Sequence, residues 1–243
     1  MKAFASDFDG TLYFENIEGG YKEEDLKKIK DFQDNGNYFG ICTGRPIIGV
    51  EKNLEGKVNL DFYIVTSGAI IFDKNKNILF KKIIEKETML SLYNMYKDIT
   101  NVMVQSPYAV YTFKIEGVNL VQTMINDINE IKDEITGMSL NAYSEENAQR
   151  ICKEIKYYYH DLDAFQNKNF IDVVAKGCSK GNAVKLIKEL LNVDTVVGMG
   201  DSYNDIPMLE KADISFTFHN SPDNVKQKAT YIVDSIYEAI EKI

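Results

Sequence analysis

Four short segments of the chain carry the residue types that a phosphoryl-transfer reaction needs. Residues 7–12 read Asp-Phe-Asp-Gly-Thr-Leu, residues 43–45 read Thr-Gly-Arg, position 180 is a lysine, and residues 200–205 read Gly-Asp-Ser-Tyr-Asn-Asp. Together they supply a carboxylate nucleophile, a second acid two residues later, a hydroxyl and a cation for the phosphoryl oxygens, and acids that can hold a metal ion. Their order predicts a phosphoryl-transfer site assembled from distant segments.

The first segment contains both the predicted nucleophile and the predicted proton donor. A carboxylate with a reference pKa of about 3.9 is ionised at neutral pH without a helper base, so Asp7 can attack phosphorus and form an aspartyl-phosphate. Asp9 can protonate the leaving alkoxide and later deprotonate the attacking water. Gly10 allows the backbone to turn sharply beside the phosphate.

A cluster of acids predicts a bound cation at the same site. The acids are Asp7, Asp9, Asp201 and Asp205. Two unit charges about 4 Å apart repel by about 4 kcal/mol even at an effective dielectric constant of about 20, so the cluster requires a cation or raised pKa values. Hard oxygen ligands favour Mg²⁺ over zinc. We expect Mg²⁺, the Thr43 hydroxyl and the Lys180 ammonium to offset charge on the phosphoryl oxygens.

The composition is that of an ordinary folded protein rather than a disordered one. The chain has 243 residues, of which 44% are hydrophobic and 27% charged, so one large domain or two modest ones are expected. No apolar run approaches the roughly 18 residues that span a bilayer, and the apolar stretch after Met1 is too short for a secretory signal. Three widely spaced cysteines suit neither a metal site nor a disulfide set. These features predict a cytoplasmic protein with no membrane partner.

The net charge of −9 argues against a nucleic-acid partner, because such a partner requires a basic face. It does not exclude a phosphorylated substrate, since exposed charges are largely screened beyond about 8 Å at physiological salt and a bound divalent ion reverses the local sign. A small phosphorylated metabolite is therefore the expected partner. The sequence gives no indication of the oligomeric state.

Strand-type apolar runs alternate with helix-period segments at both ends of the chain, which is typical of a mainly parallel sheet covered by helices on both faces. The strands expected there span residues 3–6, 38–42, 62–66, 195–199, 214–217 and 231–233, with a hairpin over 70–80. Asp7, Thr43 and Asp201 each follow one of these strands. Ligands of open α/β sheets gather beyond the carboxyl ends of the strands, so the three segments should meet in one crevice.

The middle of the chain has a different pattern. From about residue 85 to about residue 175, the expected helices span 86–98, 118–131 and 145–158, and the expected strands span 102–105, 110–115, 139–142, 163–166 and 170–174. We therefore expect a discontinuous, Rossmann-like α/β core, residues 1–83 and 177–243, with an inserted α+β cap domain at residues 84–176. Asp172 lies in the segment that returns from the cap, but the sequence does not place its side chain.

The order of these segments resembles that of the haloacid dehalogenase superfamily over essentially the whole chain. The four motifs of that family are matched, in order, by residues 7–11, by Thr43, by Lys180 within Ser-Lys-Gly, and by Gly200 and Asp201 with Asp205. Asp9 resembles the second acid of the family's phosphatases and phosphomutases, where the family's ATPases usually carry threonine. The long insertion between Thr43 and Lys180 resembles the Cof-type, class IIB branch.

The resemblance implies a role for each matched residue. Asp7 and Asp201 would bind Mg²⁺ through their side chains and Asp9 through its backbone carbonyl, with Asp205 supporting the metal. The predicted catalytic residues are Asp7, Asp9, Thr43 and Lys180. The predicted phosphate and substrate contacts are Phe8, Gly10, Thr43, Gly44, Arg45, Lys180 and Asn204.

These observations predict a magnesium-dependent phosphatase that hydrolyses a sugar phosphate or a phosphorylated cofactor through an aspartyl-phosphate intermediate. Two alternatives remain open. One is a phosphomutase or phosphotransferase with the same intermediate, which would yield a phosphate ester instead of free phosphate. The other is a non-catalytic, metabolite-binding regulator. The presence of both Asp7 and Asp9 counts against the regulator, because a binding protein needs neither a nucleophile nor a proton donor.

Overall fold

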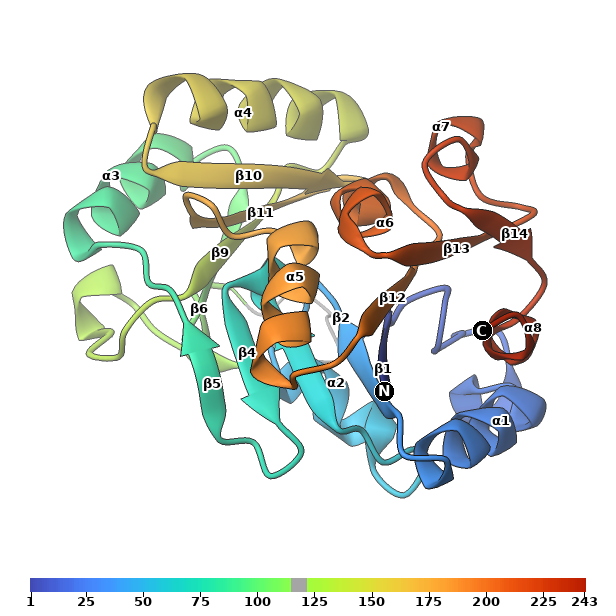
Figure 1. Ribbon diagram of the computed structural model, residues 1–243. Helices are drawn as coiled ribbons and strands as arrows, with labels where there is room; N and C mark the ends of the chain where they lie inside the picture. The colour runs from blue at the N-terminus through green and yellow to red at the C-terminus, as the bar shows by residue number, and fades with distance from the viewer. Residues whose placement is uncertain (115–121) are drawn as a thin grey trace.

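The structure, a computed structural model, describes residues 1–114 and 122–243 and contains two separate β-sheets (Figure 1). The larger sheet has eight strands in the order β14-β13-β12-β1-β2-β3-β4-β5. In chain order these are β1 (Lys2–Ser6), β2 (Tyr38–Cys42), β3 (Phe62–Val65), β4 (Ile70–Asp73), β5 (Ile78–Lys81), β12 (Thr195–Met199), β13 (Ile214–Phe218) and β14 (Tyr231–Val233). Neighbours from β14 to β3 run parallel, and β4 and β5 are antiparallel. The predicted mainly parallel α/β core is confirmed.

Helices cover both faces of the larger sheet (Figure 1). The helices around this sheet are α1 (Glu23–Asp34), α2 (Ile48–Leu54), α5 (Lys180–Leu190), α6 (Ile206–Lys211), α7 (Asp223–Lys226) and α8 (Ile236–Glu241). Side chains of a strand alternate between the two faces. Ala3 and Ala5 of β1 therefore share one apolar cluster with α5 and α6, whereas Phe4 shares the opposite cluster with α1, α2 and α8.

Parallel pairing brings the ends of β1, β2 and β12 to the same edge of this sheet. The backbone N–H of Asp7, directly after β1, donates to the carbonyl oxygen of Met199 at 2.7 Å. The N–H of Thr43, directly after β2, donates to the carbonyl oxygen of Ile64 at 2.9 Å. The residues that follow these strands are thus fixed beside one another by the sheet itself.

The smaller sheet forms the cap and has six strands in the order β10-β11-β9-β6-β7-β8. Its strands are β6 (Asn101–Gln105), β7 (Val110–Thr112), β8 (Thr123–Met124), β9 (Gly137–Asn141), β10 (Leu162–Asn167) and β11 (Phe170–Ala175). α3 (Lys86–Tyr96) and α4 (Glu145–Tyr158) pack on one face through a single apolar cluster (Figure 1). The predicted α+β cap is confirmed as a separate sheet-containing unit, and its exact boundaries stay a prediction.

One predicted cap helix is wrong in the described part of its range. Residues 122–131 of the helix expected at 118–131 contain β8 and a single 3-10 turn, Ile128–Glu130, and residues 118–121 lie outside the described residues. Ile125, Ile128 and Ile131 are all buried at a spacing of three, which imitates a helical face. Asp127 instead starts the short turn with a capping box. Within residues 1–114 and 122–243, no helix has the length and apolar character needed to cross a membrane.

Replacing Gly181 should destabilise the contact that positions the start of α5. A Cβ at Gly181 would lie 2.1 Å from the carbonyl oxygen of Pro207 on α6, so the two helices approach closely only because this residue lacks a side chain. We expect Gly181→Ala to lower the free energy of unfolding in urea by about 1–3 kcal/mol. Lys185→Ala on the exposed face of α5 is the control. An unchanged midpoint for Gly181→Ala would contradict the close packing.

Candidate active site

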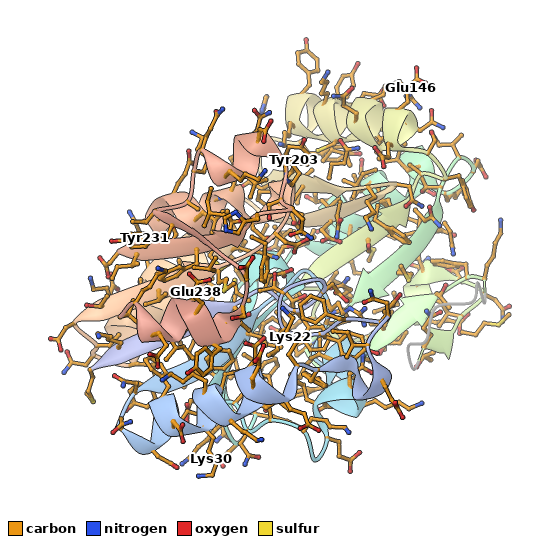
Figure 2. The ribbon with its side chains drawn as sticks, turned by 90° about the vertical axis from the view of Figure 1, so that its right-hand side faces the viewer. Lys22, Lys30, Glu146, Tyr203, Tyr231 and Glu238 are labelled. Carbon is orange, nitrogen blue, oxygen red and sulfur yellow. The ribbon has the colours of Figure 1, made fainter. Side chains whose placement is uncertain are left out.

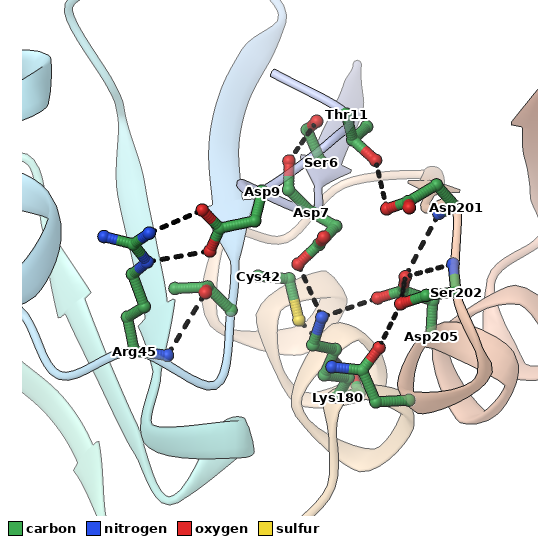
Figure 3. Close-up of polar contacts among 12 residues, drawn as sticks. Ser6, Asp7, Asp9, Thr11, Cys42, Arg45, Lys180, Asp201, Ser202 and Asp205 are labelled. Carbon is green, nitrogen blue, oxygen red and sulfur yellow. Dashed lines mark hydrogen bonds and ion pairs between the residues drawn. The ribbon is translucent and has the colours of Figure 1, made fainter. Parts of the chain in front are cut away.

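The Lys180 ammonium lies buried between two carboxylates (Figure 3). Lys180 is the first residue of α5, and the Ser179 hydroxyl caps this helix by accepting the N–H of Asn182 at 3.0 Å. Lys180 Nζ donates to Oδ1 of Asp7 at 2.6 Å and to Oδ1 of Asp205 at 2.5 Å. The three side chains are 2%, 7% and 0% exposed, so water does not replace these contacts. One cation therefore pairs with acids from two separate strand ends.

A second set of contacts holds the loop after β12 against the first motif (Figure 3). Oδ2 of Asp205 accepts the backbone N–H groups of Asp201 and Ser202 at 3.1 and 3.0 Å. The Thr11 hydroxyl donates to Oδ1 of Asp201 at 3.2 Å. Gly10 has a φ of +80°, and a Cβ there would lie 3.0 Å from Oδ2 of Asp201. Glycine at this position therefore permits both the turn and the close approach of the Asp201 carboxylate.

The cluster contains more negative than positive charge. Burial, and next the Asp205 charge, raise the pKa of Asp7 well above its usual range although Lys180 opposes the shift. Burial followed by the Asp205 charge also raises the pKa of Asp201 to about 6. Burial disfavours the charged form of Lys180, but the Asp205 and Asp7 carboxylates outweigh that effect and raise the pKa of the ammonium. The shifts of the two carboxyl groups follow first from burial and then from one cation facing three acids.

Three of the carboxylates are close enough to share one metal ion. Asp7, Asp201 and Asp205 each offer an oxygen atom, and these atoms lie within 4.8 Å of one another. An all-oxygen donor set suits a hard divalent cation. Such a cation would also offset the repulsion that raises the pKa values of Asp7 and Asp201. The residues present therefore fit a divalent metal ion.

Asp9 is paired with Arg45 rather than with the Lys180 cluster (Figure 3). Arg45 Nη2 donates to Oδ1 of Asp9 at 2.6 Å and Arg45 Nε donates to Oδ2 at 2.7 Å, the two-pronged geometry of a guanidinium on a carboxylate. The same guanidinium lies 5.5 Å from the centroid of the Phe8 ring and donates to the carbonyl oxygen of Gly49 at 3.1 Å. The sequence predicts Arg45 as a phosphate or substrate contact, whereas the structure pairs it with Asp9.

These side chains open into a cavity of about 810 Å³ between the core and the cap. The predicted site residues that line it are Asp7, Asp9, Gly10, Thr43, Gly44, Arg45, Asp201 and Asn204. Phe8, Lys180 and Asp205 are buried and are not part of its wall. The Phe8 ring stacks on the Tyr13 ring with 5.2 Å between centroids, and this contact packs the loop after β1 against the core.

Two of the predicted phosphate contacts are oriented by local hydrogen bonds. The buried Thr43 hydroxyl accepts the backbone N–H of Arg45 at 3.2 Å. Asn204 Oδ1 accepts the Ser202 hydroxyl at 2.5 Å, which leaves the Asn204 amide nitrogen as its donor group. A hydroxyl from the end of β2 and an amide from the loop after β12 thus reach the same cavity.

The sequence of residues 4–240 matches the family of haloacid dehalogenase-like hydrolases. The chain belongs to this family. The predicted family and hydrolase class are therefore confirmed. Two curated relatives from Bacillus subtilis (strain 168) are each named 5-amino-6-(5-phospho-D-ribitylamino)uracil phosphatase. YcsE is 27% identical over 241 residues, covering 98% of this chain and 92% of YcsE, and YwtE is 23% identical over 273 residues, covering 97% and 93%.

Solved structures of haloacid dehalogenase-like proteins share the whole fold. A subclass IIB sugar phosphatase, BT4131, superposes with a TM-score of 0.82 at 21% identity, covering 100% of this chain and 98% of that one. A haloacid dehalogenase-like hydrolase from B. subtilis superposes with a TM-score of 0.87 at 20% identity, covering 98% and 96%. The Cof-type, class IIB arrangement of core and cap predicted from the sequence is thus confirmed at the level of the fold.

The cap contributes a polar wall that the sequence did not assign. Gln105, Ser139 and Asp172 lie on three different cap strands and all line the cavity of this haloacid dehalogenase-like protein. The signal in the sequence is a polar residue between buried apolar ones, as with Asp172 between Ile171 and Val173. That signal predicts that Asp172 lies on the opposite strand face from Ile171 and Val173, but it does not predict that this face is turned toward the core.

The Asp172 carboxyl should make stability depend on pH. Burial raises the pKa of Asp172 from 3.8 to about 6, although the Ser139 and Ser67 hydroxyls oppose the shift. Below about pH 3 the carboxyl is largely protonated in both states, whereas between about pH 4 and pH 6 it is largely ionised in the unfolded chain and still largely protonated in the folded protein. Ionised Asp172 therefore destabilises the folded protein above about pH 6, by about 3 kcal/mol at most.

We expect Asp172→Asn to gain stability relative to the parent as the pH rises from about 4 to about 7. Urea unfolding at several pH values measures this difference. Asp98→Asn, at an exposed cap position, controls for the loss of one negative charge. A difference between Asp172→Asn and the parent that stays constant over this range would show that Asp172 does not titrate as its burial implies.

Proposed function

We propose that this haloacid dehalogenase-like protein is a magnesium-dependent phosphatase that hydrolyses a small phosphorylated metabolite through an aspartyl-phosphate. The observation that carries the proposal is the position of Asp7. Its carboxylate lies at the carboxyl end of β1, lines the cavity, and is held at 2.6 Å by the buried Lys180 ammonium. A carboxylate fixed in this way has one oxygen oriented by the lysine and can present the other to phosphorus.

In the proposed reaction, an Asp7 oxygen attacks phosphorus and the bond from phosphorus to the ester oxygen breaks. Asp9 gives a proton to the departing alkoxide, so the alcohol leaves neutral. Asp9 then accepts a proton from a water molecule as that water attacks the phosphoryl group on Asp7. Inorganic phosphate leaves and the Asp7 carboxylate is restored. Arg45 donates to both carboxylate oxygens of Asp9, so at least one of these hydrogen bonds must break before Asp9 gives or accepts a proton in either step.

Asp7, Asp201 and Asp205 would hold the magnesium ion, together with the backbone carbonyl of Asp9. When bound, the ion supplies positive charge that offsets the charge of the phosphoryl oxygens. Thr43 and Asn204 donate to those oxygens from the cavity wall, with the backbone of Gly44 beside them. Lys180 acts from behind the wall, because its ammonium is committed to Asp7 and Asp205.

The substrate proposed is a sugar phosphate or a phosphorylated cofactor. Support comes from the names of relatives, which include two 5-amino-6-(5-phospho-D-ribitylamino)uracil phosphatases and a subclass IIB sugar phosphatase. The cavity of about 810 Å³ has room for a ligand of that size. A phosphomutase would share the covalent intermediate, and it is distinguished by its product. Release of inorganic phosphate supports the phosphatase.

Asp7→Asn should abolish phosphate release from an aryl phosphate, with a rate lowered by about a thousandfold or more. Asparagine has the same shape but is not a nucleophile for this reaction. Because burial and Asp205 disfavour the ionised Asp7, we expect the thermal midpoint of the variant to stay similar or rise. Asp31→Asn on the exposed face of α1 is the matched control. Substantial turnover by Asp7→Asn would rule out this nucleophile.

Chelation should stop the reaction and magnesium should restore it. We expect EDTA-treated protein to lose turnover of the same aryl phosphate, and added Mg²⁺ to recover it and raise the thermal midpoint, because the ion binds the folded acid cluster. The measurement combines phosphate release with thermal unfolding at each Mg²⁺ concentration. Full activity in the chelated protein would contradict the metal-dependent scheme.

A further inference from the structure

The cap strands present a row of side chains to the cavity, and three of the four, Asp172, Ser139 and Gln105, are polar. Asp172 on β11 is paired directly with Ser139 on β9, and Ser139 is paired with Met103 on β6. Gln105 lies two residues beyond Met103 on the same face of β6. Asp172, Ser139, Met103 and Gln105 all line the cavity, whereas the opposite face of these strands packs on α3 and α4. This face of the cap therefore closes the cavity opposite Asp7.

Asp172 is oriented by the core as well as by the cap. Its Oδ1 accepts the Ser139 hydroxyl at 3.1 Å and its Oδ2 accepts the Ser67 hydroxyl, from the loop after β3, at 3.3 Å. A Cβ at Gly44 would lie 2.4 Å from Asp172 Oδ2, so the carboxylate reaches the backbone of the second motif. Each carboxylate oxygen can accept a further hydrogen bond. Asp172 thus offers fixed acceptors beside the predicted phosphate site.

Gln105 adds an unsatisfied polar atom to the same wall. The residue is 5% exposed, and its side-chain Oε1 has no hydrogen-bond partner among the described residues. Gln105 on β6 is paired with Gly137 on β9, which is paired in turn with Val174 on β11. A Cβ at Gly137 would lie 3.6 Å from the Gln105 Oε1, so the amide lies over this glycine. The terminal amide torsion of glutamine is soft, so a small rotation turns either amide atom toward a ligand. A buried amide without a partner is costly unless a ligand supplies one.

We propose that Asp172 and Gln105 select phosphate esters whose alcohol portion carries hydrogen-bond donors, hydroxyl or amino groups, toward the cap. This inference rests on the proposed phosphatase function. A leaving group with such donors pairs the buried Gln105 Oε1 and adds hydrogen bonds to Asp172, which already accepts from Ser139 and Ser67. An alkyl chain leaves that Oε1 unpaired and gives Asp172 no further donor. A second anionic group at that end is disfavoured, because it faces the Asp172 carboxylate. Lys168, which also lines the cavity from the cap, is exposed.

The test compares matched substrates. A pentitol phosphate and a hexitol phosphate are compared with pentyl and hexyl phosphate, which have the same chain lengths but no hydroxyl groups. We expect the parent to prefer the polyol esters in kcat/KM, and Asp172→Ala to lower that preference by about 10- to 100-fold. Asp172→Asn, which keeps an acceptor oxygen, should retain part of it. Glu146→Gln, a cap carboxylate on the outside of α4 (Figure 2), should retain it fully.

Two further variants distinguish recognition from a structural role. Ser67→Ala removes the hydrogen bond between core and cap but leaves the Asp172 carboxylate in place. Its effect on the preference should be much smaller than that of Asp172→Ala. Gln105→Met removes the unpaired amide at similar volume, so it should lower the preference while the thermal midpoint stays the same or rises.

Each outcome decides between the two proposals. If the parent hydrolyses alkyl and polyol phosphates equally, or if Ser67→Ala reproduces Asp172→Ala, the selection by Asp172 is wrong while the phosphatase function stands. A lower thermal midpoint for Gln105→Met without a change in preference removes Gln105 from the recognition wall. If the parent releases phosphate from none of these esters, nor from an aryl phosphate with Mg²⁺ present, the proposed function itself fails.

Discussion

The burial of one ammonium group between two carboxylates is the interaction on which the rest of the site depends. Lys180 contacts Asp7 after β1 and Asp205 before α6, and none of the three side chains is more than 7% exposed. None of these charges is tolerable alone in the interior, and loss of the Lys180 cation, which would leave both carboxylates unpaired, should cost about 3–5 kcal/mol. The fold therefore assembles its acids only when segments far apart in sequence meet. The charge left over is what a divalent cation would offset.

The larger sheet carries the residues proposed for the reaction, and the cap sheet carries those proposed to select the substrate. The parallel sheet fixes the acids, the Thr43 hydroxyl and the Asn204 amide at its strand ends, where the backbone leaves little freedom. The cap brings its own polar side chains over the same cavity, and one of them, Asp172, accepts a hydrogen bond from the Ser67 hydroxyl of the core at 3.3 Å. Residues proposed for the reaction therefore lie on one unit and residues proposed to discriminate between substrates on the other.

The parts of this arrangement that follow from local pattern could be predicted from the sequence. Asp7 and Thr43 come directly after buried apolar strands, and parallel pairing then places them at one edge. The ion pair between Asp9 and Arg45 and the position of Asp172 depend on packing between distant segments, which leaves no periodic signal. The helix expected around Ile128 failed for a related reason. Its buried isoleucines repeat every three residues, but a capping box and a short strand decide the backbone.

A structure of the protein with magnesium and beryllium trifluoride would identify the nucleophile and the metal ligands together, since this fluoride complex mimics a phosphoryl group bonded to a carboxylate. We predict beryllium bonded to an Asp7 oxygen, with magnesium held by the Asp7, Asp201 and Asp205 cluster. Beryllium bonded to Asp9 or to another side chain, or magnesium bound away from these three acids, would contradict this prediction.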